Sequence, residues 1–508
     1  MREGFGQSMA WLHTWAGLVV SWLLLTIFIS GTATYYRSEI TTWMHPEIRA
    51  SGPVSEVQAV DGALRWLHVN APTADGWQID LPSERLPVTQ VAWQGDGRFD
   101  SALLDPVQGQ ALSARPTQGG DFFYAFHFQL NLPPLIGRWI VGVAAMIMFM
   151  AIISGVIIHR RIFKDFFTLR PGKGQRSWLD AHNSLSVLAL PFHLLITYTG
   201  LVTLMFLYFP AASDALYRDD SAALYRDTLD YVAPPPRSGA SAPMASAAML
   251  VEQARQQWGS GHLQRLELAS PGTANARLQL VRDTDDQLSS RPRRLTVDAA
   301  DATLIEEAAP SGPARKVYSL LYGLHMAHFA DPLLRGLLFF SGLGGCLMIA
   351  TGMQLWVIKR RTGTWAWLHR RLEGLNAGVM LGLPLAMAGY FWANRLIPAD
   401  APGRDGLEVN AFFGVWLVAA LYGQCRAMGQ MWKELTALCA LGFLALPLLD
   451  TLTRPGVFSD PAASRALASG FNLTMALLGV LFASGLWHLR RRQSAPPRAI
   501  RNKARTTC

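Results

Sequence analysis

The chain has 508 residues, half of them hydrophobic, and a formal net charge of +9. Such an apolar composition excludes an ordinary soluble enzyme and indicates a polytopic membrane protein. The basic residues gather at the ends of apolar runs: residues 160–176 hold six Lys/Arg, 359–371 hold five and 490–505 hold seven. This is the positive-inside pattern, so we predict that the clusters face the cytoplasm. The positive charge is therefore not expected to serve nucleic-acid binding.

Eight apolar runs are long enough to cross a bilayer. The first run follows a basic residue, yet it is too long for a secretory signal and lacks a clear A-x-A site, so we expect an uncleaved anchor. With the basic clusters inside, both termini are predicted to be cytoplasmic. The runs lie near residues 9–36, 138–159, 183–209, 335–358, 374–393, 410–426, 433–450 and 470–488.

Two polar insertions, about 37–137 and 210–334, separate the first four runs. Each contains a helix-like stretch, Val57–Val69 or Met244–Trp258, followed by alternating strand-like runs that end in turns. The strand-like runs are Gln90-VAWQGDGRF and LLDPVQGQAL in the first insertion, and Arg265-LELAS, ARLQLVRD and RRLTVDAADATLI in the second. Pro234-PPRSGASAP is predicted to be a flexible linker. Neither insertion contains a cysteine, so both are expected to fold without disulfides.

The first four runs and their insertions form an internal repeat. A histidine precedes a glycine by eighteen residues in the first and third runs, and a further histidine precedes the second and fourth runs, each of which ends in a glycine and a basic cluster. Duplicated membrane units place their shared site at the interface between the copies, so we expect a four-helix core. The matching residues are His13 and His182, Gly31 and Gly200, His127 and His325, and Gly155 and Gly352.

Two histidines of the third run, His182 and His193, lie eleven positions apart. On one helix these residues share a face and are separated by roughly 16 Å along the axis. Ionisable side chains are costly inside a bilayer and are usually functional. The pair is therefore typical of ligands to two stacked metal centres, for which haem is the natural candidate in a membrane. No C-x-x-C-H is present, which excludes covalent c-type attachment.

These motifs resemble the PepSY-associated transmembrane family of iron-regulated membrane proteins. The resemblance rests on Trp11-LHTWAG, on the stretch from Ile157 to Leu201, and on the duplicated modules with His127 and His325. The central stretch is similar to the inner-membrane ferric-siderophore reductases of Gram-negative bacteria. Over about residues 1–373, the resemblance implies two small periplasmic α+β PepSY-like modules on a helical membrane bundle, with two haem b groups held by core histidines. The last four runs carry no motif to which we assign chemistry.

The predicted fold is a polytopic α-helical protein of the bacterial inner membrane, with about eight transmembrane helices and a four-helix haem-binding core. In chain order its parts are a first span (1–36), a first periplasmic module (37–137), a second span with its basic loop (138–182), a third span (183–209), a second periplasmic module (210–334), a fourth span with its loop (335–373), four further spans (374–488) and a basic cytoplasmic tail (489–508).

Five histidines are candidate haem-iron ligands. An inner haem between His13 and His182 fits depth and symmetry, and Gly17 beside His13 leaves room for a flat macrocycle. An outer haem takes His193 with His127 or His325, or uses the last two alone. The five are His13, His127, His182, His193 and His325.

Four further residues are secondary candidates. His328 lies on the same potential helical face as His325, and His159 is either a haem-propionate contact or an interfacial histidine. Arg138 and Arg335 end their spans on the periplasmic side and are candidate contacts to propionates or an anionic substrate, with snorkelling as the alternative. We expect the remaining histidines to be interfacial (His369, His488) or at the surface (His45, His68, His262).

These residues favour a haem relay in which an electron from quinol or a cytoplasmic reductase reduces a periplasmic ferric siderophore. Ferrous iron is then released for uptake, because hard oxygen donors hold ferric iron more tightly. Further expected partners are the lipid bilayer and periplasmic siderophore-handling proteins. The sequence has no P-loop and no G-x-G-x-x-G after a strand, so neither an ATP site nor a nicotinamide site is indicated. A siderophore or iron-chelate permease and a PepSY sensor or protease-binding protein are the alternatives.

Overall fold

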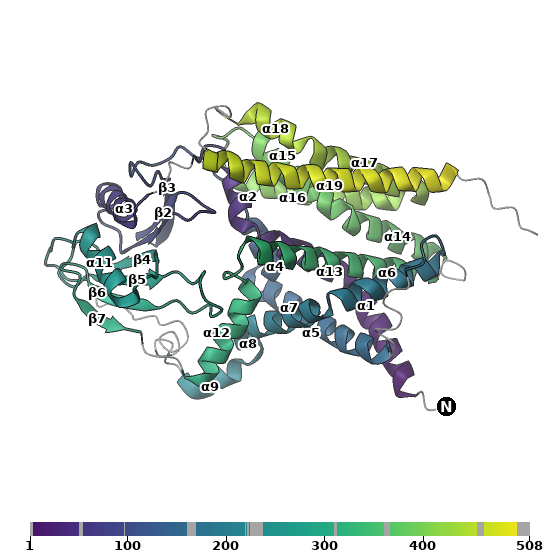
Figure 1. The fold of residues 1–508 in the computed structure, drawn as a ribbon, viewed down its shortest axis with the longest axis horizontal. Coiled ribbons are helices and arrows are strands. Elements are labelled where there is room, and N and C mark those ends of the chain that lie inside the picture. Colours follow the sequence, from purple (N-terminus) through teal and green to yellow (C-terminus); the bar gives the residue numbers. More distant parts are fainter. Residues whose placement is uncertain are drawn as a thin grey trace, which may run out of the picture. The chain divides into compact units, whose positions relative to one another are not determined.

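A computed structural model describes residues 4–49, 54–95, 97–159, 169–218, 220, 223, 237–308, 312–359, 366–454 and 462–494 (Figure 1). Much of the predicted basic loops and tail (160–168, 360–365 and 495–508) and the start of the linker (234–236) lie outside the described residues. The chain divides into two compact units. Unit 1 comprises Met1–Lys359, Ala399–Pro402 and Arg454–Ala468, and unit 2 comprises Arg360–Pro398, Gly403–Thr453 and Ser469–Cys508.

Seven long apolar helices or helix pairs in the described residues are able to cross a membrane, and a bent pair adds an eighth. This confirms the prediction of a multi-pass membrane protein. The seven spans are formed by α1 (Phe5–Thr34), α5 (Pro134–Ile158), α13 (Pro332–Lys359), α14 (Ala366–Met380) with α15 (Gly382–Leu396), α16 (Arg404–Cys425), α17 (Met428–Leu444) with α18 (Leu446–Thr453), and α19 (Ala462–Ser494).

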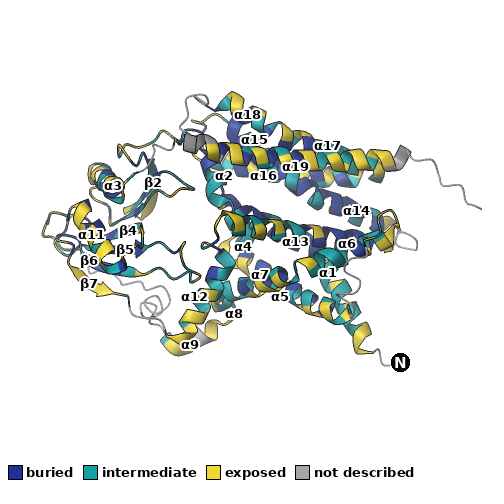
Figure 2. Cartoon of the chain, viewed as in Figure 1, coloured by how far each residue is buried: buried dark blue, intermediate teal, exposed yellow. Residues whose placement is uncertain are grey.

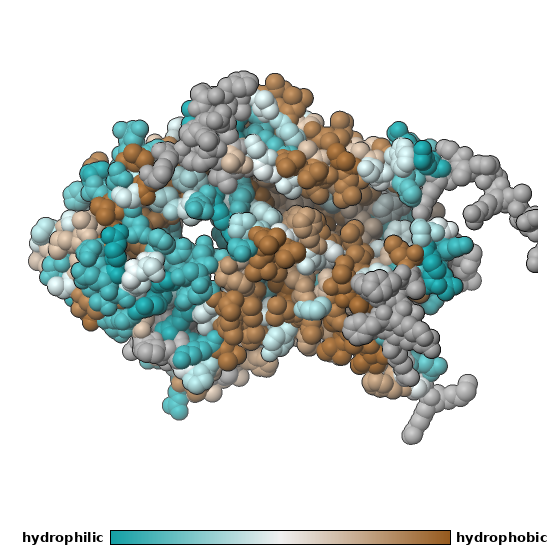
Figure 3. Space-filling model, in the orientation of Figure 1, coloured by the Kyte–Doolittle hydropathy of each residue, from teal (hydrophilic) through white to brown (hydrophobic). Residues whose placement is uncertain are grey.

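The outer faces of these helices are apolar. Along α5, large hydrophobic side chains such as Leu135, Trp139, Val143 and Met150 are exposed, and exposed residues also run along α19 (Figure 2). Hydrophobic side chains gather over the long helices, whereas hydrophilic ones gather over the sheet (Figure 3). A soluble protein rarely exposes apolar surface of this extent, so these faces are suited to lipid.

The third span is broken. Helix α6 (Gln175–Leu188) and helix α7 (Leu190–Thr203) meet at a bend of 67°. Pro191 lies in the first turn of α7, where a missing N–H and the ring clash with the preceding turn interrupt a continuous helix. The expected straight helix is therefore wrong: His182 belongs to α6 and His193 to α7, and the two imidazoles are not in line.

The polar insertions share one antiparallel sheet of seven strands, in the order β3-β2-β1-β4-β5-β6-β7. We expected two separate modules, but β1 pairs with β4 around Gln78 and Glu267. This pairing satisfies the backbone groups of two strands that would otherwise be exposed edges. The strands are β1 (Gly76–Asp80), β2 (Thr89–Gly95), β3 (Arg98–Leu104), β4 (Leu263–Ala269), β5 (Arg277–Arg282), β6 (Arg294–Asp298) and β7 (Leu304–Glu307).

Two equivalent helices, α3 (Glu56–Asn70) and α11 (Ala247–Trp258), pack against the sheet and against each other. Each begins at a serine, Ser55 or Ser246, whose hydroxyl accepts from a backbone N–H of the first turn. Their apolar faces join the inward side chains of the strands in one core, in which Trp77 donates its indole N–H to the Ala71 carbonyl. The expected helices and most strands are present, but β1 was not expected.

Short helices connect the sheet to the spans. Helices α4 and α12 matter most for the site, because both end in a left-handed residue, Leu130 or Ala327, at equivalent positions of the two repeats. The short helices are α2 (Arg37–Met44), α4 (Asp121–Gln129), α8 (Met205–Tyr208), α9 (Pro210–Tyr217) and α12 (Pro313–Met326).

Candidate functional site

The first candidate site is a pair of histidines from α1 and α6. The ring centroids of His13 and His182 lie 6.3 Å apart, with an interplanar angle of 64°. Nδ1 of His13 is 2.9 Å from the Ala151 carbonyl oxygen, and Nδ1 of His182 is 2.9 Å from that of Met348. Because a carbonyl only accepts, each Nδ1 carries the proton and each Nε2 keeps a lone pair for a metal.

The second pair comes from the last turns of α4 and α12. The ring centroids of His127 and His325 lie 6.1 Å apart, and the rings are inclined by 22°. Nδ1 of His127 donates to the Ile27 carbonyl at 2.8 Å. His325 donates to the Ile196 carbonyl and lies 3.1 Å from the Thr199 hydroxyl. The Nε2 atoms of this pair therefore have the same freedom to ligate as those of the first.

The repeat extends to individual contacts around the first pair. The acceptor carbonyls of Ala151 and Met348 each lie four residues before a glycine, Gly155 or Gly352. A Cβ on either glycine would lie 3.1 Å from the Cε1 atom of His13 or His182, respectively. Each imidazole therefore lies directly on a helix backbone that only glycine leaves open.

The second pair repeats this arrangement on α1 and α7. Ile27 and Ile196 lie four residues before Gly31 and Gly200. A Cβ on Gly31 would lie 2.6 Å from His127 Nδ1, and one on Gly200 would lie 3.0 Å from Cε1 of His325. The carbonyl and the glycine together fix where each ring lies and which nitrogen is free, which is the usual outer-shell support of a metal ligand.

The spacing of the rings fits a shared metal. Metal–imidazole bonds of about 2 Å place the centroids of two opposing rings roughly 6 Å apart. No group of three or more His, Cys, Asp or Glu within the described ranges is arranged to hold a metal ion. Each pair would therefore supply two imidazole nitrogens to a metal, and a bound group such as a porphyrin would supply its other ligands. A Cβ on Gly17 would meet nothing within 4 Å, so space is present beside His13. These observations fit haem.

His193 belongs to neither pair. Its side chain is 1 % exposed and donates to the Ser341 carbonyl, while its Nε2 atom has no hydrogen-bond partner among the described residues. A Cβ on Gly345 would lie 3.1 Å from that Nε2 atom, and the Phe28 ring lies 6.2 Å away, centroid to centroid. His193 is therefore buried against a glycine like the paired histidines, but its Nε2 atom faces that glycine, and no second imidazole among the described residues lies opposite it.

The two candidate arginines contact protein groups. Arg138 is exposed and its guanidinium lies 5.3 Å above the centre of the Phe128 ring. Arg335 donates to the Ala330 carbonyl at 2.8 Å and lies 3.6 Å from Glu39. The two positions are equivalent in the repeat, but only Arg335 is partly buried.

The secondary histidines make other contacts than the paired ones. The His328 side chain is about half-exposed, with Nδ1 3.9 Å from Asp285, and its partial burial together with the positive charge of Arg85 lowers the pKa of this imidazole. His159 forms the C-terminal cap of α5, next to residues outside the described range. His68, His262 and His488 are exposed. His45 was expected at the surface but is buried, because its Nδ1 donates to the Thr41 carbonyl at 2.9 Å.

Sequence reasoning missed an ion-pair cluster at the end of α1. Arg85 donates to both oxygens of Glu39 at 2.8 and 2.7 Å and to the Tyr35 carbonyl at 2.8 Å. Glu39 also faces Arg335, so this carboxylate joins the sheet insertion to the start of α13. Arg85 lies in a loop with no motif around it, and only the fold brings it to Glu39.

The fold and the paired histidines define a multi-pass membrane protein built on a duplicated unit of span, α/β insertion and span. Residues 10–359 match the PepSY-associated TM region family, and the chain belongs to this family. An uncharacterized protein of Pseudomonas aeruginosa is 26% identical over 382 residues, which span 71% of this chain and 92% of that protein. The family match ends with α13 and does not include the four C-terminal spans.

Proposed function

We propose that this protein is a haem-containing oxidoreductase of the bacterial inner membrane that passes electrons to ferric siderophores in the periplasm. The observation that carries the proposal is the two pairs of neighbouring imidazoles, at 6.3 and 6.1 Å, in which each of the four rings hydrogen-bonds to a backbone carbonyl. His13 with His182 would hold one haem b and His127 with His325 the other. When bound, the haem irons supply one-electron transfer between the ferric and ferrous states.

The protein groups around each imidazole prepare it for this role. The Nδ1–H···O=C bonds fix the tautomer and the ring orientation and make Nε2 a better donor. The glycines let the rings approach the helix backbone, so that neither ring needs to move when a ligand bond forms. A rigid set of ligands also keeps structural rearrangement small when the metal changes charge.

The direction of electron transfer follows from topology. From the positive-inside pattern we infer that the His13 and His182 end faces the cytoplasm and that the His127 and His325 end faces the periplasm. We propose that the sheet formed by the two PepSY-like insertions supplies the docking surface for the ferric siderophore and for siderophore-handling proteins. Arg335 and Arg138 would then meet haem propionates or an anionic chelate. Reduction loosens the complex, because hard oxygen donors favour ferric over ferrous iron.

The purified protein provides the test. We expect a pyridine haemochrome assay to give two haem b groups per chain, and reduction to change the Soret and α bands. Reduced protein should then convert a ferric siderophore to ferrous iron, detected with a ferrous chelator. Protein that is folded by circular dichroism but shows no such bands would refute the proposal.

A further inference from the structure

Unit 2 contains a polar cluster inside its apolar helices. His369, Glu373 and Asn376 follow the spacing of one face of α14 and are 8%, 4% and 2% exposed. Trp432 of α17 donates its indole N–H to the Glu373 carboxylate at 3.4 Å. His369 is expected at the membrane interface, and the packing of these helices buries it inside unit 2. Ionisable groups in such a position are costly and usually have a function.

The contact between the two titratable groups is too long for a hydrogen bond. Nε2 of His369 lies 3.7 Å from Glu373 Oε2, and this buried nitrogen has no hydrogen-bond partner among the described residues. A buried polar atom without a partner costs about 1–3 kcal/mol, so a ligand that bonds to His369 Nε2 would offset this cost. The geometry leaves His369 able to bind a third group.

The helix that carries these residues is held firmly. Arg370 donates to the carbonyls of Gly423 and Gln424 at 2.9 and 3.1 Å, at the end of α16. A Cβ on Gly374 would lie 2.6 Å from the Gly423 oxygen, so α14 and α16 are in close backbone contact. The polar face of α14 is therefore fixed in place, as a binding site requires.

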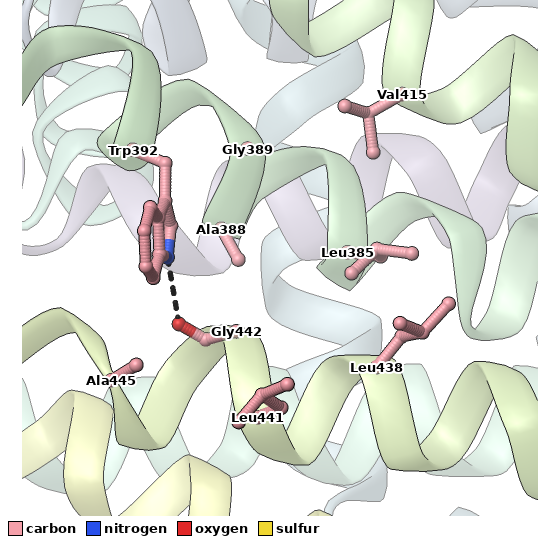
Figure 4. Close-up of a pocket in the computed structure, with 9 residues that line it drawn as sticks. All are labelled: Leu385, Ala388, Gly389, Trp392, Val415, Leu438, Leu441, Gly442 and Ala445. Carbon is pink, nitrogen blue, oxygen red and sulfur yellow. Dashed lines mark hydrogen bonds between the residues drawn. The ribbon is translucent and has the colours of Figure 1, made fainter. Parts of the chain in front are cut away.

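An apolar groove runs along the same helices. A cavity of about 410 Å³ lies between α15, α16 and α17 (Figure 4), where Trp392 donates its indole N–H to the Gly442 carbonyl. A second cavity of about 450 Å³ shares three lining residues with it, so the two lie next to each other along α15, α16 and α17. The shared residues are Leu385, Val415 and Leu438.

The groove approaches the polar cluster. Leu435 lines the second cavity and lies one turn after Trp432, the residue bonded to Glu373. Leu435 and Trp432 belong to one packed cluster with Ala377, the neighbour of Asn376. A ligand with a long apolar tail and a polar, proton-releasing head matches this combination of groove and buried titratable pair.

We propose that unit 2 binds a membrane quinol, with the ring at His369 and Glu373 and the isoprenoid tail in the groove. The inference rests on the proposed function and names its electron donor. Oxidation breaks both quinol O–H bonds, and the protons pass to His369 Nε2 and the Glu373 carboxylate. The two electrons reduce two ferric ions, one each, through the proposed relay, and quinone leaves.

A cytoplasmic reductase would need an exposed docking surface, whereas this site is buried in apolar helices.

The test uses the full chain in lipid nanodiscs and decylubiquinol as the probe. In His369→Leu and Glu373→Gln, we expect affinity for decylubiquinone to fall at least about tenfold, as the loss of one hydrogen bond to a charged group predicts. Reduction of the protein by decylubiquinol should slow, while haem content and reduction by dithionite stay unchanged. His488→Leu, at an exposed position, is the matched control and should behave like the unmodified chain.

A second variant tests the groove without altering the polar cluster. Leu438→Trp should weaken binding of the long-tailed quinone and leave a tailless quinone unaffected. Equal quinone affinity in all variants would overturn the inference. The same holds if phospholipid occupies the groove and decylubiquinone does not displace it. Quinone binding is measured without reference to haem, so a protein that binds quinone but lacks haem refutes only the proposed function. A protein that contains haem but binds no quinone refutes only this inference.

Discussion

His13 and His182 approach to a ring-centroid distance of 6.3 Å although they belong to different copies of the repeat. His127 and His325 have the same relationship, at 6.1 Å. Each pair is therefore shared between the copies, and under the proposed function neither copy alone would provide two ligands to one iron. This arrangement explains why the duplication is useful: one unit supplies an inner and an outer histidine, and two units convert them into two pairs.

Alanine variants of the four paired histidines test this sharing. His13→Ala and His182→Ala should each lower the haem content from two to one per chain, because both remove a ligand of the same iron. The double variant should also retain one haem, since effects within one site do not add. By contrast, His13→Ala combined with His127→Ala should lose both.

A pyridine haemochrome assay, normalised to protein concentration, measures these values. His68→Ala changes an exposed histidine of the sheet insertion and is the control. Loss of both haems from the His13 and His182 double variant would show that the histidines are not paired in this way.

The sequence contained enough information to predict the spans and the repeat. Long apolar runs and basic clusters are read directly from hydropathy, and the equal spacing from His13 to Gly31 and from His182 to Gly200 marks the duplication. The same spacing predicts that His13 and His182 lie at the same depth in the membrane. In the structure the two rings lie next to each other. Periodic and symmetric features of this kind depend mainly on local sequence.

Features that depend on packing between distant segments were not predicted. The bend before His193 follows from Pro191, which interrupts an apolar run whose hydropathy alone predicts one continuous helix. Pairing of β1 with β4 joins segments that are almost two hundred residues apart, and no local pattern specifies the register of Gln78 opposite Glu267. The buried position of His369 likewise arises only when α14 packs against its neighbours.

Gly31 is predicted to be essential for the outer pair. In Gly31→Ala, the new Cβ would lie 2.6 Å from His127 Nδ1, closer than atoms can approach, so the ring must leave its carbonyl partner. We expect the outer haem to be lost or to shift its reduction potential, while the inner haem is unchanged. Redox titration of the α band checks this result. Gly414→Ala, where a Cβ meets nothing within 4 Å, is the control, and equal potentials in both variants would contradict the prediction.

His193 is predicted to be dispensable for haem binding. The first repeat has Leu24 at the equivalent position, and His193 has no second imidazole opposite it. His193→Leu should therefore keep two haems per chain. Because the substitution removes a buried nitrogen without a hydrogen-bond partner among the described residues, the melting temperature should not fall by more than a few degrees. A haemochrome value of one haem would instead make His193 a ligand.

Stability of the sheet insertion should depend on Asp285. Burial, together with the negative charge of Asp283, raises the pKa of Asp285 from its ordinary value of 3.8 to about 6. Between about pH 4 and 6 the folded chain therefore binds more protons than the unfolded chain, so stability falls as pH rises through this window. Asp285→Asn should remove this loss and make the insertion more stable than the unmodified one above pH 6.

Melting temperatures of both proteins from pH 4 to 8 measure the effect, which is reduced by solvent because the carboxylate is half-exposed. The two curves should approach each other towards about pH 4, where the folded-state carboxyl is protonated and the unfolded one is close to half-protonated. Parallel curves across the whole range would show that Asp285 does not titrate with a raised pKa.

A buried ion pair in unit 2 should be the most sensitive point for stability. Arg395 donates to Asp450 at 2.6 Å, Asn472 donates to the other carboxylate oxygen at 2.8 Å, and the arginine and aspartate side chains are 0% and 3% exposed. Asp450→Ala leaves the Arg395 charge without this carboxylate in an apolar surrounding. Removal of one partner from such a pair costs about 3–5 kcal/mol.

The double variant Arg395→Met with Asp450→Leu separates the charge effect from packing. It removes both charges and keeps apolar volume, so it should recover most of the loss caused by Asp450→Ala. Thermal unfolding of detergent-purified protein, followed by size-exclusion chromatography after heating, ranks the three chains. If the melting temperature of Asp450→Ala equals that of the unmodified chain, the Asp450 carboxylate does not stabilise unit 2. If the double variant is less stable than the single one, its contribution lies in packing and in the bond from Asn472 rather than in charge.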